Sequence, residues 1–515
     1  MKSLKCSHYF LNLYLETLFA NMKLRFFALL ALAMSLGACH CSEKVSPVLD
    51  IEGGQVQGIA ADLDGVFVYK GIPYAAPPIG ELRWKAPQPV QPWEGVLQAD
   101  EFGHPSYQAV HYPGNYFTEW GYGEEKQCSE DCLYLNVWTK YPGQVDRKAP
   151  VAVWIHGGGY REGWGSEPEF DAQEWAARDV VLVSINYRLG VFGFMAHPEL
   201  SAESPDGVSG NYGILDQIES LKWVKKNIAQ FGGDPDNVMI FGQSAGGGSV
   251  RTLCASPLAK PYFHKAVIMS ANGLNVVKNQ SFSLAGGGPA LPPSMIKMMF
   301  GGQTLQEAEA EGKAVMDWAG LTDLKKMRAA ATDAVHAASA LYTSATGKPG
   351  ITITPIIDGH VSVEVFDDAA ADGSLADVPY MIGYTMNDMG DMSAGIVAFC
   401  QDREAKGSQA WAYEFARPLP DDGSHPEDRL QGAFHSSDLW FVFKSLQHCW
   451  RPWTQGDWDL SEKMLTAWTN FAKYSDPNGP DGGEWTPCTQ ESPNFMVFKL
   501  DASDAEASAL GQPVK

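Results

Sequence analysis

Apolar residues along this chain follow two kinds of pattern. Residues 180–185 form a nearly continuous β-branched run, which is typical of a strand buried on both faces of a sheet. Residues 215–231 repeat their apolar positions at a spacing near 3.6 and stop at Gly232 and Gly233, which predicts a helix and its end. Further apolar runs predict strands at 66–69, 134–138, 151–155, 238–241, 266–269 and 495–498, and near 351 and 380. Strands that alternate with helices predict an α/β fold, with a mostly parallel central sheet and helices on both faces.

The alternation stops between residues 275 and 350. This stretch contains Gly286-Gly287-Gly288 and Pro292-Pro293 and continues with alanine-rich segments of helical pattern. We interpret it as an insertion or helical cap beside the sheet and not as a separate domain. Residues 48–515 are therefore expected to form a single domain, which a short polar tether at 39–47 joins to an N-terminal leader.

The leader has the layout of an export signal. A basic start at residues 22–25 precedes an apolar run at 26–36, which is too short to span a bilayer. The run ends in Leu-Gly-Ala-Cys at 36–39, which resembles the lipobox of bacterial lipoproteins and implies lipidation of Cys39. We therefore expect translation to begin at Met22, residues 1–38 to be leader and signal peptide, and the mature protein to be exported to the bacterial cell envelope or the periplasm. A plain cleaved signal with a chance cysteine is the alternative.

Charge and composition exclude two classes of function. The net charge of −23 argues against nucleic-acid binding, because phosphate contacts need clustered lysine and arginine. No Cys/His cluster has zinc-site spacing, so no metal site is expected. The excess of acidic residues is typical of a protein that charge keeps soluble.

Residues 242–246 read Gly-Gln-Ser-Ala-Gly and match the pattern G-x-S-x-G. They follow the predicted strand at 238–241 and precede a helix-compatible stretch at 245–253, which is the strand–turn–helix setting of a nucleophile elbow. The helix N-terminus favours the negative charge that develops there. Ser244 is therefore the predicted nucleophile, and a glycine-rich turn with an ordinary serine is the alternative.

Residues 156–160 read His-Gly-Gly-Gly-Tyr and follow the predicted strand at 151–155. Consecutive glycines let backbone N–H groups point into a cavity without obstruction, as an oxyanion hole requires. We assign the donors to Gly158 and Gly159, with Ala245 as a third. The alternative is a glycine turn after a strand.

Taken together, these blocks resemble the type-B carboxylesterase family, which includes cholinesterases and bacterial para-nitrobenzyl esterases. The resemblance covers nearly all of residues 48–500. Its other signatures are Tyr-Lys-Gly-Ile-Pro-Tyr-Ala at 69–75, Ser-Glu-Asp-Cys-Leu-Tyr-Leu-Asn-Val-Trp at 129–138, Asn-Tyr-Arg-Leu-Gly at 186–190, Gly-Asn-Tyr-Gly-Ile-Leu-Asp-Gln at 210–217, Phe-Gly-Gly-Asp-Pro at 231–235, Trp-Thr-Asn-Phe-Ala at 468–472 and Asp-Pro-Asn at 476–478. The resemblance implies an α/β-hydrolase fold with a helical cap, and hydrolysis of carboxylic esters through an acyl-enzyme without a cofactor.

The family order of serine, acid and histidine places the other two catalytic residues. Asp388 follows the predicted strand near 380 and occupies the acid position, where the family more often has Glu; Asp391 is its rival. Asp358 matches a structural turn of the family instead.

His435 lies in Gly-Ala-Phe-His-Ser-Ser-Asp-Leu at 432–439, which resembles the family's catalytic-histidine block. His425 and His448 lack that context.

The chain departs from its relatives at several points. Gln243 replaces the Glu that often precedes the serine in cholinesterases, which weakens the case for a cationic choline substrate. In the family, the first disulfide pairs the cysteine at Cys132 with one upstream; the resemblance places Ser106 at that upstream position, and Cys128 is a hypothetical substitute partner. The segment from Asp388 to His435 is short for the family, which predicts a reduced helical lid.

An aromatic-rich loop offers two interpretations. Its members are Tyr107, His111, Tyr112, Tyr116, Phe117, Trp120 and Tyr122. Packing is the default, and a gorge that selects aromatic or otherwise apolar esters is the alternative.

The expected activity is therefore hydrolysis of a small-molecule carboxylic ester. Removal of acyl or feruloyl groups from glycans at the cell surface is a variant of it. The competing hypothesis is a non-catalytic binding module, like the neuroligins, which keep the fold but lack the serine.

Overall fold

The computed structural model describes residues 45–109, 118–122, 127–271, 302–426 and 430–500. The predicted leader, the lipidation site Cys39, the first part of the tether and the aromatic residues 111–117 lie outside these ranges, so those expectations stay predictions. Within the described ranges, no helix is both long enough and apolar enough to cross a membrane.

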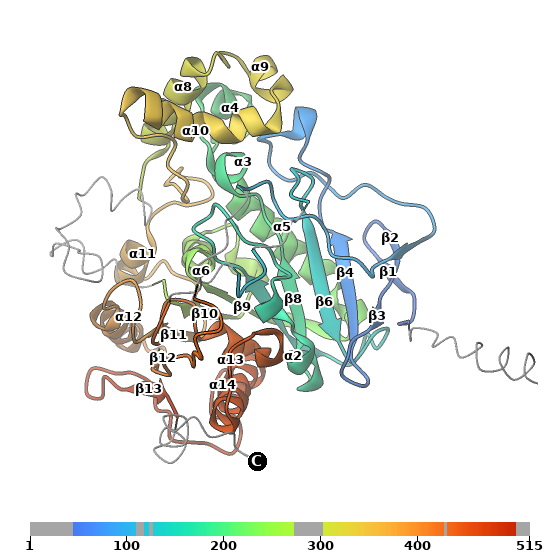
Figure 1. Cartoon of the computed structure of the whole chain (residues 1–515), viewed down its shortest axis with the longest axis vertical. Helices are drawn as coiled ribbons and strands as arrows, with labels where there is room; N and C mark the ends of the chain where they lie inside the picture. The colour runs from blue at the N-terminus through green and yellow to red at the C-terminus, as the bar shows by residue number, and fades with distance from the viewer. Residues whose placement is uncertain (1–44, 110–117, 123–126, 272–301, 427–429, 501–515) are drawn as a thin grey trace, which may run out of the picture. The chain divides into compact units, whose positions relative to one another are not determined.

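A ten-stranded sheet forms the centre of the molecule, in the order β13-β12-β11-β10-β9-β7-β8-β6-β4-β3 (Figure 1). Its six neighbouring pairs from β8 through to β13 are parallel, whereas β3, β4 and β6 extend it antiparallel. The bounds are β3 Ile59–Ala60, β4 Phe67–Pro73, β6 Tyr134–Thr139, β7 Ala149–Ile155, β8 Val181–Ile185, β9 Gly233–Gln243, β10 Lys265–Met269, β11 Tyr380–Thr385, β12 Ala410–Phe415 and β13 Phe495–Phe498. A second sheet contains β1 Leu49–Ile51, β2 Gly54–Gln57 and β5 Val96–Gln98. The predicted mostly parallel α/β sheet is confirmed.

Successive residues of the central strands supply two separate hydrophobic layers. In β7, Val151, Val153 and Ile155 join one buried cluster, while Ala152 and Trp154 join another, because neighbouring side chains point to opposite faces of a sheet. Helices α3 Gly190–Phe194, α4 Pro198–Glu203, α5 Tyr212–Asn227, α6 Ala245–Ala255, α11 Phe366–Asp372 and α12 Ser393–Ala405 contribute to the first layer. Helices α2 Gln173–Ala177, α13 Leu439–Phe443 and α14 Gln455–Tyr474 contribute to the second. Helices therefore cover both faces, as predicted.

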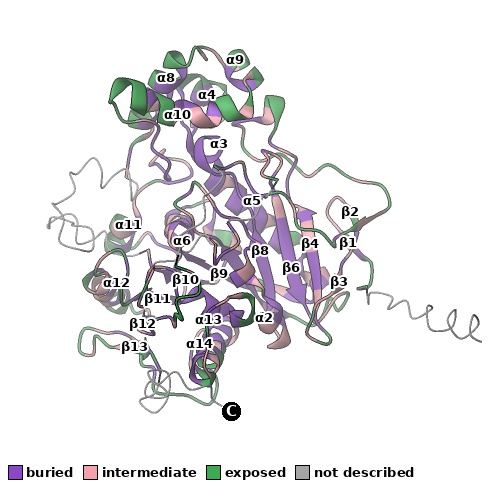
Figure 2. Cartoon of the chain, viewed as in Figure 1, coloured by how far each residue is buried: buried purple, intermediate pink, exposed green. Residues whose placement is uncertain are grey.

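The predicted cap contains three helices, α8 Leu305–Trp318, α9 Leu324–Ala329 and α10 Thr332–Thr346. They lie together at the top of Figure 1, and Figure 2 shows their outward faces as exposed. Their buried side chains, among them Val315, Met327 and Val335, belong to the same hydrophobic cluster as one face of the sheet. The cap therefore shares its core with the sheet.

The strand predicted near residue 351 is wrong. Residues 351–356 are buried but form no strand, and Ile357 makes only an isolated bridge with Thr304. The backbone of Ile356 bonds instead to the side chain of Asn211, at 3.0 Å through its N–H and at 2.8 Å through its carbonyl. Apolar residues favoured a strand here, but a side chain satisfies the backbone where a neighbouring strand would have done so.

The helix predicted at 215–231 has shifted bounds. α5 covers Tyr212–Asn227, and a 3₁₀ turn continues it through Ile228–Phe231.

A buried ion pair connects the loop after β8 to α5. Arg188 and Asp216 are 2% and 0% exposed, and the guanidinium bonds the carboxylate at 2.7 Å and 2.6 Å. Removing one partner of such a pair leaves an uncompensated buried charge. We expect Asp216→Ala to lower the free energy of unfolding by about 3–5 kcal/mol in urea titrations.

The exposed helical pair Lys313–Asp317, with its charged atoms 2.7 Å apart, provides the matched control. Asp317→Ala should cost below about 0.5 kcal/mol, because solvent screens an exposed pair. Equal losses in the two variants would contradict the assignment of the buried pair.

Candidate active site

Ser244 lies in a strained turn between β9 and α6. Its backbone has φ 56° and ψ −123°, which a non-glycine residue rarely adopts. The turn depends on close backbone packing, since a Cβ atom added to Gly246 would lie 2.0 Å from the carbonyl oxygen of Ile155. Gly242 has no space for a side chain either, because a Cβ atom added to it would lie 2.5 Å from the carbonyl carbon of Gly246. The predicted strand–turn–helix setting is therefore present, and the turn lifts the half-buried Ser244 to the end of the sheet.

The glycine loop after β7 lies directly against this turn. A Cβ atom added to Gly157 would approach the Cβ of Ser244 to 3.2 Å. Gly158 and Gly159 follow with φ of 92° and 60°, in the region that glycine reaches without strain. Within the described residues, the N–H groups of these two glycines donate no hydrogen bond. Ala245 begins α6, so its N–H is among those that a helix leaves without an internal acceptor.

His435 and Asp388 come from two different loops and meet beside Ser244. The Nδ1 atom of His435 lies 2.6 Å from an Asp388 carboxylate oxygen. The two loops are joined by backbone, because Asn387 donates its N–H to the carbonyl of Ala433 at 2.9 Å. The Nε2 atom of His435 faces the side-chain amide of Gln243 at 3.3 Å, next to Ser244 in the chain. The imidazole thus has Asp388 at one nitrogen and the elbow at the other.

Asp388 is almost fully buried and strongly bonded. It is 6% exposed, and it accepts hydrogen bonds from the Met389 N–H at 2.7 Å and the Thr385 hydroxyl at 3.1 Å. Burial by itself would raise the pKa of Asp388, but the charge of His435 and its hydrogen bond hold that pKa below its ordinary value. The carboxylate is therefore ionised and orients the ring with Nδ1–H toward it.

The alternatives from the sequence lie elsewhere. Asp391 is exposed and bonds Ser393 at the start of α12. Asp358 accepts three backbone N–H bonds in a turn, as the structural interpretation required. His448 pairs with Asp171 at 3.0 Å, and the ring of His425 packs on Trp450 at 4.4 Å.

A model of the carboxylesterase family matches residues 45–398 and 391–512 of the chain. The chain belongs to the carboxylesterase family. It is 33% identical over 505 residues to a para-nitrobenzyl esterase of Bacillus subtilis, which is 88% of this chain and 94% of that protein. It is 36% identical over 333 residues to a fumonisin B1 esterase of Sphingopyxis macrogoltabida, which is 64% of this chain and 54% of the relative.

An acetylcholinesterase of Leptinotarsa decemlineata is 34% identical over 351 residues. The matches to this protein and to the fumonisin esterase span about half the length of each relative, 53% and 54%. Among solved structures, a para-nitrobenzyl esterase and a Geobacillus stearothermophilus carboxylesterase each superpose with a TM-score of 0.70 at 28% identity. The superpositions cover 90% of this chain and 99% and 100% of those chains. The expected α/β-hydrolase fold is confirmed over its length.

The substitute disulfide suggested for this family member is absent. Cys128 and Cys132 are both free thiols. Cys132 is buried and bonds the side chain of Ser106, whereas Cys128 lines a cavity with Tyr107. Ser106 therefore stands beside Cys132 as suspected, and the two cysteines face different surroundings.

Two other departures from the family can be located. Between Asp388 and His435, the described residues contain α12 and β12 as their helix and strand, in keeping with a reduced lid. Of the aromatic loop, Trp120 and Tyr122 are buried, and the ring of Tyr122 packs on Trp164 at 4.7 Å. These two residues serve packing, which was the default interpretation.

A second carboxyl beside His435 was not recognised from the sequence as part of the site. Asp438 is 0% exposed and accepts a hydrogen bond from Tyr413 at 3.3 Å, while its other oxygen has no partner in the described structure. Burial, and then the charge of Asp388, raise the pKa of Asp438 to about 7, although His435 acts in the opposite direction. The sequence signal for Asp438 was its place in the family's histidine block, where an acidic residue follows the histidine by three positions.

Glu167 and Glu169, shortly after the glycine loop, were also missed. Both are buried, and Glu167 accepts bonds from Tyr122 at 3.0 Å and from the Trp164 N–H at 2.9 Å. Burial raises the pKa of Glu167 to about 7 and that of Glu169 well above its ordinary value. The sequence carried no signal for them, because carboxylates are ordinarily exposed.

Asp438→Asn should change how stability depends on pH. The folded protein holds the Asp438 proton up to about pH 7, whereas the unfolded chain releases it near its ordinary pKa of about 3.9. The group therefore stabilises the fold below the lower pKa, and this stabilisation is lost as the pH rises through the higher one. Between pH 4 and 8, we expect the free energy of unfolding to fall by a few kcal/mol more in wild type than in Asp438→Asn, on the order of 1.4 kcal/mol per pKa unit. Urea unfolding at each pH measures this difference.

The exposed Asp391→Asn serves as the control and should keep the wild-type pH dependence. If Asp438→Asn keeps it as well, Asp438 is ionised in the fold at low pH and the assignment is wrong.

Proposed function

We propose that this chain hydrolyses small-molecule carboxylic esters as a serine hydrolase, with Ser244 as nucleophile, His435 as general base and Asp388 as its partner. The single observation that carries the proposal is the 2.6 Å bond between His435 and Asp388 beside the strained turn at Ser244. Such a constellation of nucleophile, base and orienting acid is recognised by geometry and roles. Membership of the carboxylesterase family supports the same reaction.

The chemistry follows from the protonation states. Asp388 is ionised, so it accepts a hydrogen bond from the Nδ1–H of His435 and leaves Nε2 with a lone pair. Nε2 takes the proton of Ser244 as its oxygen attacks the ester carbonyl, and His435 returns that proton to the departing alcohol. A water molecule deprotonated by the same nitrogen then cleaves the acyl-enzyme and releases the acid.

The tetrahedral intermediate requires donors for its negative oxygen. We propose the backbone N–H groups of Gly158, Gly159 and Ala245, since the first two donate no other bond and the third begins α6. Each such donor contributes about 10²–10³ in rate. The helix N-terminus adds its positive potential at the same point.

The names of the relatives indicate a wide range of ester substrates. Their names refer to fumonisin B1, para-nitrobenzyl esters and acetylcholine. The neutral Gln243 lies 3.3 Å from His435 in this chain, so it supplies no charge there for a choline-like cation. We therefore propose a neutral or anionic ester over a cationic one; aromatic esters and acyl groups on glycans fall within this class.

Ser244→Ala should lower kcat for 4-nitrophenyl acetate through octanoate by about 10⁶, as in other triad enzymes. A serine-directed fluorophosphonate should label the wild-type protein and not the variant. The half-buried Ser393→Ala provides a control for loss of a hydroxyl elsewhere and should keep full activity. A folded wild-type protein that neither turns over these esters nor takes the label would instead favour the non-catalytic binding module.

Asp388→Asn should lower kcat by about 10⁴, because an amide donates to Nδ1 and stabilises the wrong tautomer. Asp391→Asn is its matched control, an exposed carboxylate three residues away, and should remain within twofold of wild type. Steady-state kinetics at pH 8 measures both. A large loss in Asp391→Asn together with an active Asp388→Asn would exchange the two roles.

A further inference from the structure

Arg161 lies at the end of the glycine loop that faces Ser244. Its N–H donates to the carbonyl of Gly158 at 2.9 Å, so the chain folds back tightly after the two glycines. Tyr160 in between has φ 60° and is buried, whereas the side chain of Arg161 is exposed. The exposed guanidinium thus belongs to a residue whose backbone is bonded to Gly158, one of the glycines proposed for the oxyanion hole.

Among the arginines that the structure describes, Arg161 is the one whose side chain makes no hydrogen bond, ion pair or cation–π contact. The others all have such partners, as Arg188 has Asp216 and Arg451 has Glu119. The chain holds 61 acidic residues against 38 basic ones, so carboxylates are abundant. An arginine that directly follows the glycine loop and has no hydrogen-bonded partner is therefore available for a ligand.

The loop of Arg161 is tied to a neighbouring segment that carries Tyr107. Gln108 and Gly163 exchange two hydrogen bonds, at 2.9 Å and 3.1 Å, which hold Tyr107 against the glycine loop. The ring of Tyr107 meets that of His336 on α10 at 5.3 Å. Burial lowers the pKa of His336; Asp333 acts in the opposite direction, and the charge of Arg161 lowers that pKa further.

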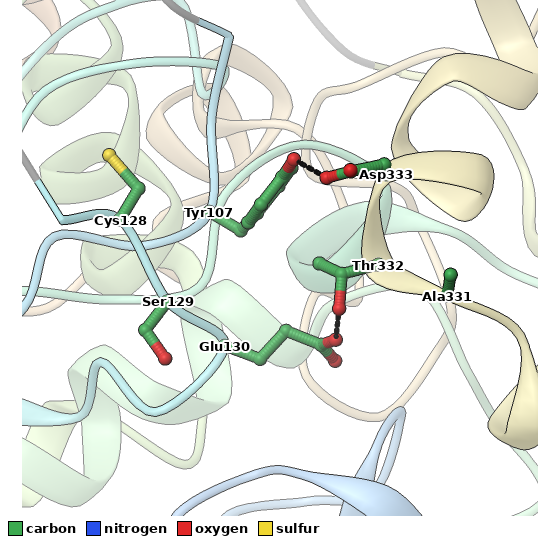
Figure 3. A pocket seen from close by; sticks show the side chains of 7 residues that line it. All are labelled: Tyr107, Cys128, Ser129, Glu130, Ala331, Thr332 and Asp333. Carbon is green, nitrogen blue, oxygen red and sulfur yellow. Dashed lines mark hydrogen bonds between the residues drawn. The ribbon is translucent and has the colours of Figure 1, made fainter.

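A cavity of about 460 Å³ lies beside Tyr107, between that residue, the segment 128–130 and the start of α10 (Figure 3). Its carboxylates already have partners within the protein. Glu130 bonds Arg83 at 2.7 Å and Thr332 at 2.7 Å, and Asp333 accepts the hydroxyl of Tyr107, as Figure 3 shows. Neither carboxylate pairs with Arg161, and the acidic group whose charge acts on its guanidinium is the adjacent Glu162.

We propose that Arg161 binds a carboxylate carried by the ester substrate. This inference rests on the proposed ester hydrolysis. A guanidinium stays charged at every physiological pH and matches the two oxygens of a carboxylate with two parallel N–H donors. The preferred substrates are then esters of dicarboxylic acids or esters whose alcohol carries an acid.

Isosteric pairs of esters test this proposal. 4-Acetoxybenzoate and 4-acetoxybenzamide differ only by a charge on the leaving group; monomethyl glutarate and its ω-amide differ by the same charge on the acyl group. We expect wild type to prefer the carboxylate of at least one pair in kcat/KM by roughly tenfold to a hundredfold, the range of a charged hydrogen bond. Arg161→Gln should remove that preference through KM and leave the amide within twofold. Arg161→Lys should keep part of it.

Arg147→Gln is the matched control. It removes one exposed arginine that precedes β7, at the opposite end of the strand from the glycine loop, and should leave the preference intact. Equal losses for acid and amide in Arg161→Gln would assign Arg161 a structural role and overturn the proposal. So would a wild-type enzyme that hydrolyses both members of each pair equally. If wild type fails on these pairs and on 4-nitrophenyl acetate as well, the proposed ester hydrolysis falls too.

Discussion

The backbone turn at Ser244 is the constraint on which the site depends. Its φ of 56° is strained for serine, and the surrounding backbones approach so closely that Gly246 has no room for a Cβ atom. The turn persists because β9 and α6 are both fixed by packing, in the middle of the sheet and on its apolar face. The glycine loop after β7 and the loops after β11 and β12 end at the same edge, since these strands run parallel. The parallel sheet therefore brings distant segments to one serine.

Burial and partners give the acids around this serine different charges. Asp388 has the imidazole of His435 and several donors, so it stays ionised although it is buried. Asp438 has one long bond to Tyr413 and a neighbouring negative charge, so it keeps its proton to about pH 7. Two carboxyls near one histidine thus reach opposite states, as pairs of titratable groups in active sites often do.

The cap is joined to the sheet and to Tyr107. Its helices share the hydrophobic cluster of the sheet, which holds α10 in place. Tyr107 contacts His336 of α10, and Tyr107 is itself fixed to the glycine loop by the Gln108–Gly163 bonds. Cap and glycine loop are therefore connected through packed rings and the Gln108–Gly163 bonds.

The sequence by itself determined the structural features that depend on residues close together in the chain. The parallel sheet, the turn at Ser244 and the glycine loop were all readable, because strand periodicity and glycine requirements are local. Asp388 and His435 came from a family pattern, but the choice over Asp391 needed the 2.6 Å contact across two loops. The strand near 351 failed for the same reason, since Asn211 satisfies that backbone and no pattern in the segment signals it. The proton on Asp438 and the unpaired Arg161 were decided only by tertiary structure, because charge state and pairing depend on burial and on partners far away in the chain.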